Sequence, residues 1–343
     1  MRGLLRGAGV PVIAAVMGLA VAVSPGQTSA QQTHLVVVSG ASGAAEFRER
    51  FHQWGLTVVQ AAVDKHGLDP ADVIWLAERP EMDPLIDGPS RRENIEAALG
   101  ALSERAGPND AVMIVLIGHG TSGGGESRFN VPGRDLSATD FAFLLERFGT
   151  RNVVFVNTAS ASGAFISEIS GPNRTVITAT RSPREGNATR FAGFFADAFA
   201  GEVADTDKDQ RVSVLEAFAY ARREVERSFD EEGLLATEHA LLDDNGDGVG
   251  SGFKEEDDLD GALARTVFLS RGGGRVTDAE IAADPELAAL YGQRQALEEQ
   301  IAALTALKDT MDAEQYEAEL EGLLVELTLT TRAIREREGG GGR

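Results

Sequence analysis

The chain has 343 residues, of which 43% are hydrophobic and 25% charged, enough to bury the core of one large domain or two modest ones. Its formal charge of −22 argues against nucleic acid as a partner, because phosphate binding depends on Lys and Arg. It has no cysteine, which excludes disulfides, cysteine-ligated zinc, iron–sulfur clusters and a thiol nucleophile.

Residues 1–30 have the pattern of a secretory signal peptide. Arg2 and Arg6 precede an apolar run, Val10 to Val23, that is too short to span a bilayer comfortably, and small residues lead to Ala30. Cleavage after Ala30 would take the formal charge to −24. We expect a secreted or periplasmic protein with no membrane span in the mature chain; an uncleaved anchor is the alternative.

From residue 34 to about residue 200, apolar β-branched runs alternate with helical patterns. This alternation predicts an α/β fold in which helices cover both faces of a parallel sheet. The predicted strands are 35–38, 73–76, 112–117, 153–156 and 175–179, and the predicted helices are 47–63, 90–102, 137–148, 191–200 and 214–225. Ser90 is predicted to cap the helix 90–102, with Glu93 completing a capping box. Ser137 or Thr139 is predicted to cap the helix 137–148.

In such sheets, function collects at the carboxyl ends of the strands. The loops that follow three of the predicted strands are Ser39-Gly40, Gly118-His119-Gly120 and Thr158-Ala159-Ser160. The last two follow consecutive strands, so we expect the Ser160 hydroxyl beside the His119 imidazole. That is the minimum for a nucleophile and its base. The alternative is a structural histidine.

Several short segments occur in one recognisable order: strand, His-Gly, strand, Ala-nucleophile-x-Ser-Gly. They are Ser39-Gly40-Ala41-Ser42-Gly43 with Phe47-Arg48, His119-Gly120-Thr121-Ser122-Gly123, Pro132 with Asp135-Leu136, Ala159 to Gly163, and Pro183-Arg184-Glu185. Over residues 34–200 this order resembles the caspase-like fold, and most closely the legumain-like asparaginyl endopeptidases. The resemblance implies a caspase-like three-layer sandwich with a mostly parallel sheet. It also implies catalytic positions at His119 and Ser160, with Arg48, Gly120 and Ser162 around the substrate.

The chain departs from this family at three positions. Ser160 stands where the family has its catalytic cysteine. Ala161 follows it, where the asparagine-specific members usually carry an acidic residue, and Glu49 follows Arg48, where those members carry histidine. Arg48 alone would still attract a carboxylate or carboxamide, but asparagine specificity does not follow.

A serine hydroxyl needs a strong, oriented base, whereas a cysteine is partly thiolate at neutral pH. The sequence offers Asp135 and Glu126 as orienting groups only because they lie in the histidine loop. We therefore expect an exported homologue without cysteine endopeptidase activity that binds a peptide or protein ligand. The alternative is an active serine-type hydrolase with a Ser160–His119 dyad.

Residues 205–216 have the ligand spacing of an EF-hand calcium loop. With Asp205 as position 1, carboxylates fall at positions 1, 3, 5 and 12, a hydroxyl at 9 and a backbone carbonyl at 7. The candidate ligands are Asp205, Asp207, Asp209, Arg211, Ser213 and Glu216. Gln210 stands where glycine is expected, and a Ser213–Glu216 capping box on an acidic loop is the alternative.

Residues 243–254 repeat the start of this pattern, with Asp243, Asn245 and Asp247 as candidate ligands and glycine in its proper place. Position 12 is Lys254, which cannot ligate; Glu255 or Glu256 could replace it after a local shift. We expect calcium as the cofactor of this acidic, EF-hand-like region, which completes a domain over residues 34–270.

The third region, residues 285–338, has two near-heptad apolar patterns. They are Leu290, Leu297, Ile301, Leu304 and Met311, then Tyr316, Leu320, Leu323, Leu327 and Ile334. They predict a helical hairpin or short coiled coil, which could act as an interaction module and drive self-association. A helical tail packed on its own domain is the alternative.

Overall fold

The computed structural model describes residues 32–108, 110–124, 126–208, 211–252, 260–269, 284–306 and 313–340. The predicted signal peptide lies outside these residues, as do Asp209, Gln210, residues 254–256 and the Gly-rich stretch after residue 270. No helix among the described residues has the length and apolar character needed to cross a membrane.

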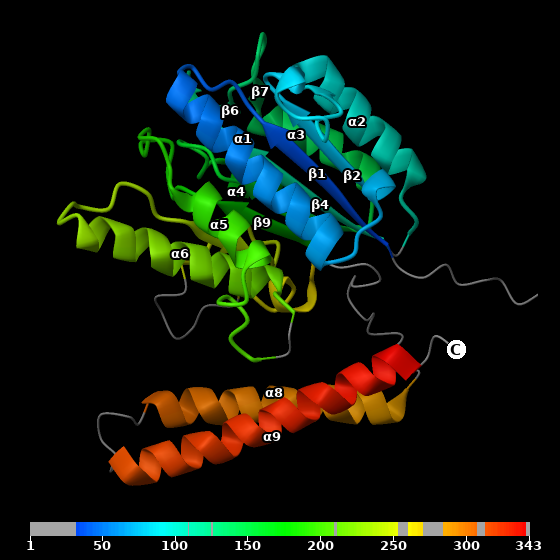
Figure 1. Cartoon of the computed structure of the whole chain (residues 1–343), viewed down its shortest axis with the longest axis vertical. Helices are drawn as coiled ribbons and strands as arrows, with labels where there is room; N and C mark the ends of the chain where they lie inside the picture. Colours follow the sequence, from blue (N-terminus) through cyan, green and yellow to red (C-terminus); the bar gives the residue numbers. More distant parts are fainter. Residues whose placement is uncertain are drawn as a thin grey trace, which may run out of the picture. The chain divides into compact units, whose positions relative to one another are not determined.

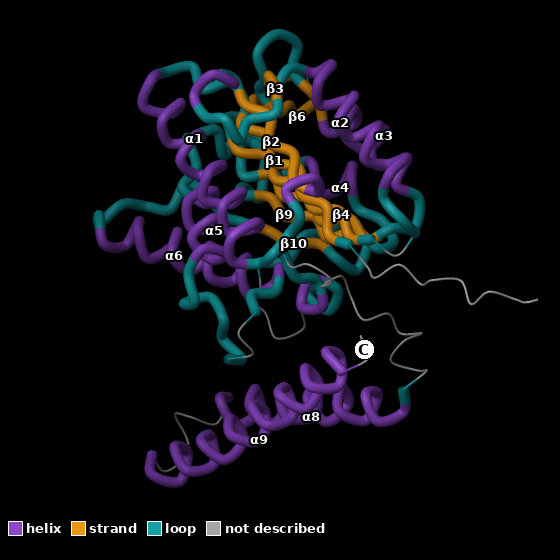
Figure 2. Tube along the Cα trace, turned by 45° about the vertical axis from the view of Figure 1, so that its right-hand side comes forward, coloured by secondary structure: helices purple, strands orange, loops and turns teal. Residues whose placement is uncertain are grey.

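The fold is built on a seven-stranded sheet, which the views of Figures 1 and 2 show twisting through the centre of the domain. In spatial order its strands are β10 (Leu241–Asp243), β9 (Arg174–Thr178), β8 (Asn152–Asn157), β4 (Ala111–Ile117), β1 (Thr33–Ser39), β2 (Val73–Ala77) and β3 (Gly88–Pro89). All neighbours are parallel except β10 and β9. The five predicted strands are confirmed; the short edge strands β3 and β10 carry too few apolar residues to have been predicted.

Helices cover both faces of the sheet. The helices are α1 (Ala45–Gln60), α2 (Arg92–Arg105), α3 (Ala138–Leu145), α4 (Phe165–Ile169), α5 (Phe191–Ala200) and α6 (Val214–Glu231). Alternate side chains of β1 enter different cores: Leu35 and Val37 pack with α1, α5 and α6, whereas Val36 and Val38 pack with α2, α3 and α4. This is an α/β layered architecture with a mostly parallel sheet, which is consistent with a caspase-like fold.

The helix caps follow the sequence only in part. Ser137 caps α3 in a capping box with Asp140, and Ser213 caps α6 with Glu216. The predicted Ser90–Glu93 cap is wrong: α2 begins one residue later, and its N-cap Arg91 makes no side-chain cap. Ser90 lies fully buried, its amide bonded to the carbonyl of Ala77, because the chain has just left strand β3.

A second, three-stranded antiparallel sheet stands at the carboxyl edge of the large one. It consists of β5 (Gly120–Gly123), β6 (Glu126–Phe129) and β7 (Leu136–Ser137). β5 begins directly after His119, so this small sheet fixes the chain that leaves the histidine loop.

The C-terminal region contains α8 (Pro285–Ala306) and α9 (Ala313–Gly340), which lie against each other (Figure 1). Arg337 near the end of α9 pairs with Asp284 and Glu286 at the start of α8, with 2.6 Å from its Nε to Asp284 Oδ2. The two helices therefore run antiparallel.

Candidate active site

The histidine and serine loops leave the same edge of the large sheet. β4 and β8 are parallel neighbours, with Leu116 opposite Asn157 in register, so the loops after them start side by side. Thr158 joins the loops, because its amide and its hydroxyl both donate to the carbonyl of Leu116, at 3.0 and 2.7 Å.

Ser160 is bonded to the backbone of the histidine loop. Its hydroxyl donates to the carbonyl of Gly120 at 3.0 Å and accepts from the amide of Gly120 at 3.1 Å. The Ser160 residue is only 3% exposed. A Cβ at position 120 would lie 2.2 Å from the Ser160 carbonyl oxygen, so only glycine permits this close approach.

His119 packs against helix α1. Its ring lies edge-on to Phe47 and Phe51, with centroid separations of 4.5 and 5.0 Å. Burial lowers the pKa of His119, and a hydrogen bond to the backbone of Ser42 partly opposes that shift. The ring is therefore neutral at pH 7 and able to accept a proton.

The hydrogen bonds of Ser160 and His119 point to different groups. Among the described residues, the Ser160 hydroxyl bonds to Gly120 alone, and no hydrogen bond joins it to the His119 ring. The two loops meet, but the proton of the hydroxyl is directed at a carbonyl oxygen and not at the imidazole.

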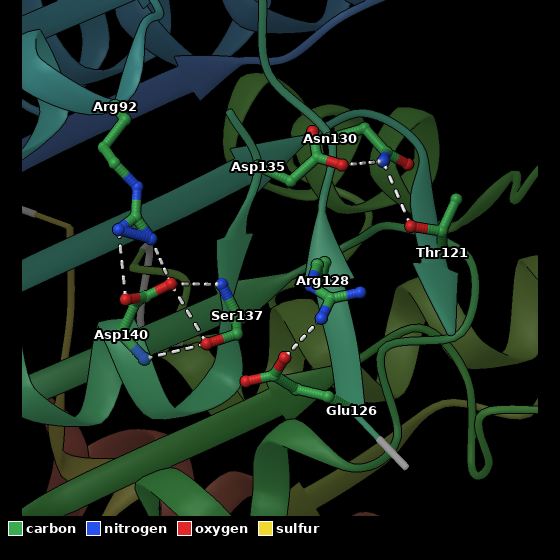
Figure 3. A network of polar contacts seen from close by, with 8 residues as sticks. All are labelled: Arg92, Thr121, Glu126, Arg128, Asn130, Asp135, Ser137 and Asp140. Carbon is green, nitrogen blue, oxygen red and sulfur yellow. Dashed lines mark hydrogen bonds and ion pairs between the residues drawn. The ribbon is translucent and has the colours of Figure 1, made fainter. Parts of the chain in front are cut away.

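Asp135 and Glu126 do not orient the histidine. Asp135 accepts from the Asn130 side chain at 2.9 Å, and Glu126 pairs with Arg128 at 2.6 Å (Figure 3). Asp135 also accepts from the Val131 amide at 3.0 Å. Both carboxylates stabilise the small sheet and its connection. The His119 ring hydrogen-bonds instead to the backbone of Ser42 and packs against Phe47 and Phe51.

Arg48 lies near the histidine loop, but it already has an acidic neighbour. Its Nε is 3.6 Å from Glu78 Oε2, in an ion pair whose side chains are 35% and 25% exposed. Both residues line a cavity of about 10 Å³ beneath Gly40 and Ser42. That volume holds about one water molecule at most, so in this state the cavity cannot admit a side chain.

Ser162 is buried, and its hydroxyl stabilises the loop that carries it. Its hydroxyl bonds to the hydroxyl of Thr180 at 3.0 Å and accepts from the amide of Thr180 at 3.2 Å. Between Ser160 and Ser162, Ala161 has a left-handed backbone with φ of 53°, a conformation that disfavours side chains. The nucleophile loop is thus a tight turn that is fastened to the end of β9.

A larger cavity of about 300 Å³ lies beyond this turn, beside β9, β10 and α6. Glu238 and His239 line it, and His239 Nδ1 is 2.7 Å from Glu185 Oε1. Burial raises the pKa of Glu238 to about 7, although it accepts from the amides of Arg190 and Phe191. This cavity was not predicted, because its residues come from helices, a strand and loops that are far apart in the sequence and share no motif.

The first acidic loop brings three predicted ligands together. Carboxylate oxygens of Asp205, Asp207 and Glu216 all lie within 4.8 Å of one another. Glu216 also accepts from the amide and hydroxyl of Thr206, at 2.8 and 2.9 Å, and forms the capping box with Ser213. The predicted capping box and the clustered carboxylates therefore coexist.

Of the other predicted ligands in this loop, Asp209 lies outside the described residues. The Arg211 guanidinium lies over the Phe268 ring, 3.6 Å from its centroid. Lys208, between Asp207 and Asp209, has a left-handed backbone with φ of 60°.

The second acidic loop is organised around its own amides. Asp243 is 1% exposed and accepts from the amides of Gly246 and Gly248, at 3.1 and 2.9 Å. Asn245 and Asp247 bond to each other at the surface. Within the described chain, these residues do not form a cluster of three acidic groups like that of the first loop.

Comparison with known families agrees with this site. Residues 94–241 match the model of the Peptidase C13 family, the legumain family. No curated protein matches the chain. The matched segment contains His119, Ser160 and the first acidic loop, and it carries the strands that position them. Over residues 94–241 the chain is therefore similar to the legumain family of peptidases, the family that its motifs resemble.

Proposed function

We propose that this protein is an exported legumain-family homologue that binds a peptide or protein ligand and has no cysteine endopeptidase activity. One observation carries the proposal: the oxygen at the nucleophile position, Ser160 Oγ, hydrogen-bonds to both backbone groups of Gly120. A serine in this position needs the imidazole as its base, and its proton is directed elsewhere.

The surroundings of the site support binding over cleavage. Arg48 is neutralised by Glu78, and Ala161 and Glu49 replace the residues expected of asparagine-specific members. A ligand would therefore meet a site whose backbone is that of a peptidase, without the thiolate that attacks a peptide carbonyl.

The test is incubation of the mature protein with a peptide library, with and without calcium. We expect no cleavage, and retention of a subset of peptides on the immobilised protein. Turnover that disappears in both Ser160→Ala and His119→Ala would overturn the proposal.

A serine-type hydrolase is the second candidate, and two observations favour it. The Gly120 amide, which donates to Ser160 Oγ at 3.1 Å, would be free to donate to a developing oxyanion once the Ser160 hydroxyl turned toward the imidazole. The pKa of His119 is lowered by burial, so its imidazole is unprotonated and able to act as a base.

We further propose that the first acidic loop binds calcium through Asp205, Asp207 and Glu216, together with Asp209, Ser213 and the Arg211 carbonyl. The donors are all hard oxygen ligands of the kind that Ca²⁺ prefers. Calcium would tie the chain between α5 and α6 to the start of α6, and so stabilise the layer beneath the nucleophile loop. The second loop, with Asp243, Asn245 and Asp247, is a weaker candidate for the same ion.

The paired helices α8 and α9, which correspond to the region predicted over residues 285–338, are proposed to support self-association. Leu324, Val325 and Leu329 of α9 are 43%, 52% and 60% exposed, an unusual run of large apolar side chains on one helix. Deleting residues 285–343 and measuring the molecular mass tests this. We expect the full chain to be larger than a monomer and the truncated chain to be a monomer; a monomeric full chain would refute it.

A further inference from the structure

Glu78 makes a cluster of contacts next to the histidine loop. It lies directly after β2, and its Oε2 accepts from the Ser42 hydroxyl at 2.5 Å and from the Ser42 amide at 3.3 Å. The same oxygen is 3.6 Å from Arg48 Nε. A short hydrogen bond to a carboxylate is among the stronger neutral-to-charged contacts in proteins.

The backbone of Ser42 hydrogen-bonds to the His119 ring. Ser42 is 1% exposed and lies in the loop between β1 and α1, where the next residue, Gly43, has a left-handed backbone with φ of 69°. A loop with a glycine hinge has several accessible conformations, so something must select the one that presents its backbone to the imidazole. The two bonds to Glu78 hold both the side chain and the amide of Ser42.

We infer that Glu78 is a positioning residue, which acts through Ser42 to hold the His119 imidazole in one orientation and one tautomer. The contact runs from Glu78 Oε2 to the Ser42 hydroxyl and amide, and from the Ser42 backbone to the ring. Glu78 does not touch His119 or Ser160. This inference rests on the proposed function, in which His119 and Ser160 mark the ancestral peptidase site, and it identifies what preserves that site.

The chain offers a matched control for the alternative that Glu78 merely neutralises Arg48. Arg48→Ala removes the ion pair and leaves both bonds to Ser42 intact. Glu78→Gln keeps an acceptor oxygen for Ser42 and removes the charge. Glu81→Ala removes an exposed carboxylate from the same segment, since Glu81 pairs only with Arg79 among the described residues.

The readout is the ¹⁵N NMR spectrum of the His119 ring at pH 8, where the imidazole is neutral. The full chain should show two well-separated resonances, one for a protonated and one for a bare nitrogen. In Glu78→Ala the two resonances should move toward each other as both tautomers become populated. Glu78→Gln, Arg48→Ala and Glu81→Ala should match the unmodified chain.

Two results would overturn the inference: an unchanged His119 spectrum in Glu78→Ala, or an equal shift in Arg48→Ala. If Glu78→Ala does not fold, Ser42→Ala takes its place, since it deletes the 2.5 Å bond without creating a charge. A shift in the same direction then supports the inference, and none overturns it. The NMR spectrum does not depend on turnover. The inference about Glu78 can therefore fail while the proposed function passes the peptide-library test, and the proposed function can fail while the inference about Glu78 holds.

Discussion

The amide of Ala161 donates a hydrogen bond of 2.8 Å to the carbonyl of Glu185, so the residue after Ser160 is fastened to the loop that follows β9. The Glu185 side chain continues the connection. It pairs with His239 at 2.7 Å and with Arg181 at 3.1 Å, and it is 12% exposed. The turn that carries Ser160 therefore depends on contacts with two segments that are distant in sequence.

Glu185→Ala should destabilise the protein by about 1–2 kcal/mol, because it removes a mostly buried carboxylate and so leaves His239 and the Arg181 amide without an acceptor. Urea unfolding measures this change. Glu168→Ala removes an exposed carboxylate from α4 and should stay within about 0.5 kcal/mol of the unmodified chain. Equal effects of the two substitutions would show that the Glu185 contacts add no stability.

Glu238 should make stability fall as the pH rises. Burial raises its pKa from 4.5 to about 7 in the folded protein, so between these values the folded state holds a proton that the unfolded state has lost. Its contribution is therefore fully present below pH 4.5 and is lost as the pH passes 7. Glu238→Gln should be more stable than the unmodified chain at pH 8 by up to about 3 kcal/mol, and less so at pH 5.

Urea unfolding of the two proteins at pH 5, 6.5 and 8 checks this prediction. A constant difference in unfolding free energy across the three pH values would mean that Glu238 titrates normally.

Removal of calcium should lower the melting temperature. If the first loop binds the ion with an excess of about a hundredfold over its Kd, the ion adds about 2.7 kcal/mol, which corresponds to several degrees. A chelator should produce this shift in the unmodified chain, and Asp205→Ala combined with Asp207→Ala should show the lower value with or without chelator. Asp230→Ala, an exposed site on α6, should retain the full response. A melting temperature that is the same with and without the chelator would contradict the calcium proposal.

Gly120→Ala should damage the site, because the added Cβ would lie 2.2 Å from the Ser160 carbonyl and 3.0 Å from the Arg128 carbonyl, both backbone atoms. We expect a loss of about 2–3 kcal/mol, as for overpacking in a core. Gly123→Ala is the matched control on the same strand, since nothing lies within 4 Å of its added Cβ. Calorimetry of both variants gives the comparison, and a mild effect at Gly120 would mean that the two loops are not held together.

The sequence predicted the sheet and the place of the site, because both follow from local patterns. Buried apolar runs such as Val112 to Ile117 predict strands, and the loops after these strands meet at one edge of the sheet. It could not predict Glu78, Glu185 or Glu238, since each acts through contacts between segments 36 or more residues apart. The failed cap at Ser90 has a similar cause, because burial beside β3 overrides the local preference of a serine for a helix start.

We propose that the chain keeps the framework of a peptidase and has no nucleophile that cleaves peptides. Cleavage of a peptide library by the unmodified protein and by Ser160→Cys tests it most directly, with Ser167→Cys as an exposed control. We predict no cleavage by the unmodified protein or by Ser167→Cys, and measurable cleavage by Ser160→Cys that a thiol alkylator abolishes. Cleavage by the unmodified protein that survives the alkylator and is lost in Ser160→Ala would contradict the claim.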